Sequence, residues 1–134
     1  MSKKEAYDHC LAISKIYALS KRASNERLGR NPLGFLLFKL FCKKVMDKGF
    51  PKEGWKVVWK ERSFKRIAFE MHSCIYCEMT KAFGCSELCS VFCQNDIITF
   101  AGFEPTIYFR RKGTLAEGNP ICDFTFLNGK KVSK

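Results

Sequence analysis

Apolar side chains recur with the helical period through the first fifty residues. The pattern predicts one helix over residues 4–27, and Gly29 with the pair Asn31-Pro32 ends it. A second helix is predicted over residues 33–48, with Gly49 as its C-cap. Five apolar side chains of the second helix are expected to point into the core: Leu37, Leu40, Phe41, Val45 and Met46.

From Gly54 onward the apolar period changes from that of a helix to two, which is typical of half-buried strands. Two such stretches follow each other, and residues 62–65 between them are expected to form a hairpin loop. Six apolar residues carry the alternation: Trp55, Val57, Trp59, Ile67, Phe69 and Met71.

Two further helices and two further strands complete the pattern. Ser73 is expected to cap a helix that begins at Cys74 and ends near Gly84. A helix over residues 86–100 follows, and then come strands over 106–111 and 121–126. The order ααββααββ predicts an α+β fold in which helices cover an antiparallel sheet of about four strands.

The chain has 134 residues, of which 46% are hydrophobic, and this suits one core rather than two. We therefore expect a single domain over residues 1–134, with N-terminal helices over 1–50 and an α+β core over 54–127. The most apolar stretch, residues 33–45, contains three lysines and is too short to span a membrane. The charged N-terminus has no apolar segment after it, so we expect a cytoplasmic protein without a membrane partner.

The net charge is +11, from 24 Lys and Arg against 13 Asp and Glu. Such an excess indicates an anionic partner or substrate, or only a solvated basic surface. The basic residues are spread along the chain and match no nucleic-acid-binding motif. An aromatic content of 14% suggests base stacking, but most phenylalanines occupy core positions of the pattern. We therefore expect no nucleic acid as partner.

The chain contains eight cysteines. A reducing cytosol keeps thiols free, so no disulfide framework is expected, and each cysteine is a core residue, a ligand or a catalyst. Cys85, Cys89 and Cys93 follow at steps of four, which would stack three thiols on one helical face. Such a stack can hold a soft metal, but the spacing does not match a zinc module with two cysteine pairs. Core packing is favoured, and no metal or other cofactor is expected.

Three cysteines lie in positions that suit proton or nucleophile chemistry. Cys93 and Asp96 are three apart on a predicted helix, so they share a face unless the carboxylate points into solvent. Cys122 and Asp123 are neighbours in a strand and point to opposite faces, so only one of them easily joins a given pocket. Cys74 is predicted to begin a helix, where the helix dipole favours a thiolate, although it can equally pack against the sheet.

Several residues of the second half together resemble the L-2-amino-thiazoline-4-carboxylic acid hydrolase family. The resemblance covers roughly residues 69–126, and its densest signatures are ELCSVFCQND and TLAEGNPICDF. The matching positions are Cys74-Ile75-Tyr76, Gly84, Glu87-Leu88, Cys93, Asp96, residues 114–118 and residues 122–124.

The resemblance implies a hydrolase whose partner is a small-molecule carboxylate: it opens the cyclic isothiourea ring of this substrate and forms an N-carbamoyl cysteine. The reaction needs one group to activate water or to attack directly, and another to protonate the departing atom. For proton transfer the resemblance points to Asp96 and Asp123, and for a nucleophile to Cys93 or Cys122. The expected substrate-binding residues are Cys74, Tyr76, Glu87 and Thr114, with Arg110 or Arg111 to bind the substrate carboxylate.

The principal alternative is a non-catalytic module that binds or senses a small molecule. Proteins of one fold often keep a pocket and change its chemistry. A hydrolase releases a thiol when it opens the ring and a binding module does not, so thiol release distinguishes the two functions.

Overall fold

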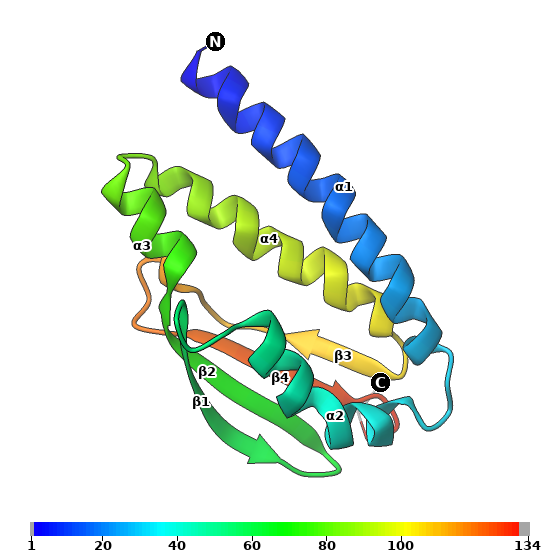
Figure 1. Cartoon of the computed structure of the whole chain (residues 1–134). Coiled ribbons are helices and arrows are strands. Elements are labelled where there is room, and N and C mark those ends of the chain that lie inside the picture. The colour runs from blue at the N-terminus through cyan, green and yellow to red at the C-terminus, as the bar shows by residue number, and fades with distance from the viewer. Residues whose placement is uncertain (1, 132–134) are drawn as a thin grey trace.

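The structure is a computed structural model that describes residues 2–131. Its elements, in chain order, are α1 (Lys3–Gly29), α2 (Gly34–Gly49), β1 (Trp55–Arg62), β2 (Arg66–Cys74), α3 (Ile75–Ala82), η1 (Ser86–Leu88), α4 (Cys89–Phe100), η2 (Ala101–Phe103), β3 (Ile107–Arg110), η3 (Leu115–Glu117) and β4 (Cys122–Asn128). The strands form one antiparallel sheet in the order β1-β2-β4-β3. Helices cover one side of this sheet (Figure 1), which confirms the predicted α+β class.

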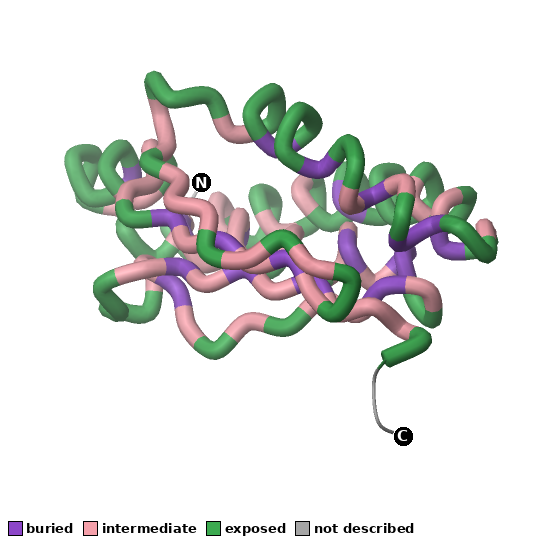
Figure 2. The backbone as a smooth tube through the Cα atoms, turned by 90° about the horizontal axis from the view of Figure 1, so that it is seen from below, coloured by how far each residue is buried: buried purple, intermediate pink, exposed green. Residues whose placement is uncertain are grey.

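The two central strands, β2 and β4, present an apolar face to the helices. Residues with the alternating period are buried on this face, and the residues between them are half-buried or exposed (Figure 2). Phe69 lies opposite Phe124 in the register, and their rings stack with centroids 4.8 Å apart. On the other face Glu70 lies opposite Asp123. Cys122 therefore points toward the helices and Asp123 away from them, as the alternation predicts.

Helix α2 packs on the sheet through a different face from the one predicted. Its buried side chains are Phe35, Phe38, Cys42 and Met46. Three of the side chains expected in the core are exposed instead: Leu40 by 59%, Phe41 by 56% and Val45 by 59%. The prediction is confirmed for Met46 and wrong for these three side chains, because α2 carries apolar side chains on two faces and the sheet buries the face with Phe35 and Phe38.

Helix α1 lies along α4 and touches the following turn η2 (Figure 1). The backbones approach closely at one point, where a Cβ on Gly29 would lie 2.6 Å from the carbonyl oxygen of Gly102. Only glycine permits this approach. Farther along, the Asn25 amide donates a hydrogen bond of 2.9 Å to the Thr99 carbonyl, and Asn95 donates one to Ser14.

Two helix starts differ from the prediction. Cys74 ends strand β2 and is the N-cap residue of α3, so Ser73 caps nothing there. The helix expected from residue 86 begins with the turn η1, and α4 itself begins only at Cys89. Cys85 therefore precedes the helix and does not stack with Cys89 and Cys93.

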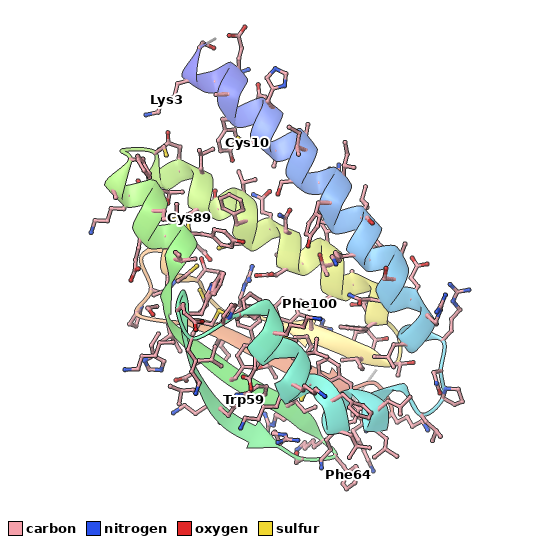
Figure 3. All side chains as sticks on the ribbon, viewed as in Figure 1. Lys3, Cys10, Trp59, Phe64, Cys89 and Phe100 are labelled. Carbon is pink, nitrogen blue, oxygen red and sulfur yellow. A yellow bond between two sulfur atoms is a disulfide. The ribbon has the colours of Figure 1, made fainter. Side chains whose placement is uncertain are left out.

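The expectation of free thiols is wrong for one pair of cysteines. Cys77 of α3 and Cys89 of α4 form a disulfide, which lies where these two helices meet (Figure 3). Cys89 is thus unavailable as a metal ligand. Within residues 2–131, no three His, Cys, Asp or Glu side chains are placed to hold a metal ion. The helices of the same range include none that is both long and apolar enough to cross a membrane.

Candidate active site

A small chamber lies between α4 and the sheet, near the point where β2 runs into α3. Its volume is about 40 Å³. We call it the polar chamber, and its polar wall consists of Cys74, Tyr76, Cys93, Asp96, Arg111 and Cys122. The remaining walls are largely aromatic and apolar: Phe50, Trp55, Met71, Cys89, Phe92 and Phe124.

Local structure brings the predicted residues together. Cys93 and Asp96 are one turn apart on α4, so both reach the same wall. Cys122 enters from β4, in the register position opposite Met71. Cys74 enters at the end of β2, because the chain turns there into α3. The chamber therefore gathers three free thiols and one carboxyl from three separate elements, β2, α4 and β4.

Arg111 is the only cationic residue among those that line the chamber. It lies directly after β3, and only 8% of its side chain is exposed. One Nη donates a hydrogen bond of 3.0 Å to Asp96 Oδ2, and the other donates one of 2.9 Å to the Cys93 carbonyl. Its guanidinium also lies 5.6 Å from the ring centroid of Phe109 and 5.7 Å from that of Phe124. These contacts fix the cation beside the carboxyl.

Burial raises the pKa of four chamber groups, among them the Tyr76 hydroxyl. It raises the pKa of the Asp96 carboxyl to about 6, although the charge of Arg111 opposes this rise. Burial also raises the pKa of the Cys93 thiol to about 12, and the neighbouring Cys122 adds to the effect. The pKa of Cys122 is raised by burial as well, but a hydrogen bond from the Leu115 backbone opposes it. At neutral pH the chamber thus holds an ionised carboxyl of unusual basicity beside two protonated thiols.

The loop after β3 positions a backbone donor against Cys122. The Leu115 N–H donates to the Cys122 sulfur over 3.1 Å. Asp123 fixes the start of this loop by accepting hydrogen bonds from the N–H groups of Lys112 and Gly113, at 3.0 and 2.9 Å. Thr114 is the N-cap residue of the turn η3. The signature TLAEGNPICDF therefore encodes a loop that holds the Leu115 N–H within hydrogen-bond distance of the Cys122 sulfur.

Four of the residues predicted for the site lie outside the chamber. Asp123 faces the opposite side of the sheet and acts on the loop backbone. Thr114 is buried, and its hydroxyl is engaged by Glu117, to which it donates over 2.8 Å. Glu87 is exposed and pairs with Lys3 of α1 at 3.1 Å. Arg110 is exposed and lies over the Tyr108 ring, so of the two arginines considered it is Arg111 that enters the chamber.

A second, larger cavity adjoins the polar chamber. It has a volume of about 650 Å³ and lies between α2 on one side and α1 with α4 on the other. The two cavities share four wall residues: Phe50, Tyr76, Phe92 and Asp96. We call the larger cavity the apolar groove, because apolar side chains of α2, among them Leu37, Phe41 and Val45, form one of its walls. The sequence did not indicate it, since the prediction placed Phe41 and Val45 in the core.

Comparison with known proteins agrees with the resemblance in the second half of the chain and extends it. The family model described as L-2-amino-thiazoline-4-carboxylic acid hydrolase matches residues 3–126 of the 134-residue chain. No curated protein and no solved structure shows a significant match. The family match includes α1 and α2 as well as the elements that surround the chamber. The chain therefore belongs to the L-2-amino-thiazoline-4-carboxylic acid hydrolase family.

Proposed function

We propose that the protein is a hydrolase that opens a five-membered cyclic isothiourea bearing a carboxylate and releases an N-carbamoyl cysteine-type thiol. One observation carries the proposal: Asp96, with its pKa raised to about 6, lies beside Arg111 in a chamber that also holds thiols. Such a carboxyl is largely ionised at pH 7 and is still basic enough to accept a proton. It therefore suits a general base.

The reaction follows from this acidity. Asp96 takes a proton from water as the oxygen adds to the ring carbon between sulfur and nitrogen. The carbon–sulfur bond then breaks, and the sulfur leaves with its bonding electron pair. Protonated Asp96 returns the proton to this sulfur, and the transfer is downhill because an ordinary thiol has a pKa of about 8.5. The second proton of the water moves from the added oxygen to the ring nitrogen, and the ring carbon becomes the carbonyl of the product.

Arg111 has two roles in this scheme. Its ion pair with Asp96, at 3.0 Å, keeps the carboxyl ionised despite burial. Because a guanidinium carries five N–H donors, donors remain for the carboxylate of a substrate. Arg111 can thus orient the substrate through the substrate carboxylate and keep Asp96, the general base, ionised.

Water is favoured over a cysteine as the attacking group. The thiolate is the nucleophilic form of cysteine, and burial raises the pKa of both Cys93 and Cys122. Of the two, Cys122 is the better nucleophile candidate, because the Leu115 N–H can stabilise its thiolate. In the water route both thiols remain neutral and only line the chamber.

A non-catalytic binding module is the second candidate function, and the apolar groove of about 650 Å³ favours it, since it can hold a ligand without any reaction. Incubation with 2-amino-thiazoline-4-carboxylate in large excess over the protein, followed by a thiol-specific colour reagent, separates the two. Multiple turnovers of released thiol would support the hydrolase. A rise in melting temperature without thiol release would show a binder instead.

A further inference from the structure

The polar chamber is too small for a substituted ring. Its volume of about 40 Å³ is close to the space of one water molecule in the liquid, about 30 Å³. The ring must therefore extend into the apolar groove, with its reactive carbon at the wall that both cavities share. Tyr76 and Phe92 stack in this wall with ring centroids 4.4 Å apart, and Asp96 belongs to it as well.

The groove offers two chemically distinct walls beyond this junction. Helix α2 contributes an apolar wall, which includes Leu37, Phe41 and Val45. Helices α1 and α4 contribute polar side chains, among them Lys21 and Asn25. At about 650 Å³ the groove lies in the usual range for sites that bind drug-sized ligands, roughly 300–1,000 Å³. A small thiazoline carboxylate would leave most of it filled only with water.

We propose that the groove binds a hydrocarbon arm of the substrate, so that the preferred substrate is a cyclic isothiourea carboxylate carrying an alkyl or aryl substituent. The inference rests on the proposed function and specifies its substrate class. The exposed Phe41 and Val45 then form the surface on which the arm lies, and this accounts for these two apolar side chains, which the core does not bury.

The chemical step is unchanged by the arm. In an N-alkyl 2-amino-thiazoline-4-carboxylate, water adds to the ring carbon and the carbon–sulfur bond breaks. Sulfur gains one proton of the water, and the ring nitrogen gains the other. The product is an N-(alkylcarbamoyl) cysteine, so thiol release still reports turnover. Methyl, butyl and hexyl members of this series provide arms of increasing length.

The test compares kcat/KM along this series. Full burial of one methylene raises affinity up to about fourfold, which corresponds to ~0.8 kcal/mol. Because the groove is partly open, we expect the hexyl substrate to exceed the methyl one by at least about tenfold, mainly through a lower KM. Phe41→Glu places a charge on the groove wall, so the ratio of kcat/KM for the hexyl substrate to that for the methyl substrate should fall close to one. Leu40→Glu is the matched control: Leu40 is exposed on the same helix, does not line the groove, and the variant should keep the ratio of the unaltered protein.

Other outcomes separate this inference from the proposed function. Equal kcat/KM for all three substrates would overturn the inference and leave the hydrolase standing. If the protein opens none of the substrates, calorimetric titration decides. Tighter binding of the hexyl than of the methyl compound, weakened in Phe41→Glu, would support the groove as a ligand site. Absence of binding would refute it. A dimer that Phe41→Glu converts to a monomer, with no dependence on arm length, would mean that a second copy covers the groove.

Discussion

The carboxyl of Asp96, whose side chain is 24% exposed, links stability to pH in a direction opposite to that of most acidic residues. Its pKa is raised from the ordinary value of 3.8 to about 6, so the folded chain holds this proton more tightly than the unfolded chain does. The contribution of Asp96 to stability is therefore fully present below about pH 3.8 and is lost as pH rises through 6. The total loss is about 3 kcal/mol, at about 1.4 kcal/mol for each pKa unit.

Asp96→Asn removes this titration, so the test compares the variant with the unaltered protein. Urea unfolding at several pH values gives the free energy of unfolding of each, and their difference isolates the one carboxyl. We expect this difference, unaltered protein minus variant, to fall by roughly 2 kcal/mol between pH 4 and pH 7. The substitution also leaves Arg111 without its partner, but arginine stays charged throughout this range, so the slope is unaffected.

Glu87→Gln serves as the control with the opposite sign. A backbone hydrogen bond and the partner Lys3 lower the pKa of Glu87, so its stabilising contribution is lost as pH falls. The difference curve for this variant should therefore rise with pH. A flat or rising curve for Asp96→Asn would refute the reasoning about the buried carboxyl.

Three further predictions concern the surroundings of the chamber. Arg111→Met leaves a buried carboxylate without its cation, and we expect a loss of about 3 kcal/mol in urea unfolding at pH 7; a loss below about 1 kcal/mol would contradict the buried pair. Replacing Cys77 and Cys89 together by serine opens a short covalent loop and should lower stability under non-reducing conditions by up to about 3 kcal/mol, and unchanged stability would argue against the disulfide. Cys122→Ser should open the ring at a rate within about tenfold of that of the control variant Cys10→Ser. Complete loss of activity in Cys122→Ser, together with a covalent substrate adduct in mass spectra of the unaltered protein, would establish attack by cysteine.

The composition of the chamber was largely predictable, because much of it depends on local periodicity. A spacing of three on a helix places Cys93 and Asp96 together, and alternation in a strand separates Cys122 from Asp123. The choice between Arg110 and Arg111 was left open, since alternation gives opposite faces without saying which face the helices cover. The structure decides it by burying Arg111 under α4.

The features that the sequence did not predict depend on contacts between residues far apart in the chain, or on which of two apolar faces of a helix becomes buried. Asp123 holds two backbone N–H groups ten and eleven residues away, and no local pattern marks such a role. The pairing of Cys77 with Cys89 requires α3 and α4 to meet, which spacing alone does not specify. Helix α2 offers two apolar faces, so only the packed sheet shows that Phe38 is inside and Phe41 outside.

The central claim is that Asp96 acts as the base that opens the ring, and one measurement tests it directly. The kcat/KM for 2-amino-thiazoline-4-carboxylate should rise with pH through about 6, level off above it, and fall by roughly a hundredfold or more in Asp96→Asn. Glu87→Gln, which alters a carboxyl outside the chamber, should follow the profile of the unaltered protein. Ring opening by Asp96→Asn at the unaltered rate would contradict the account.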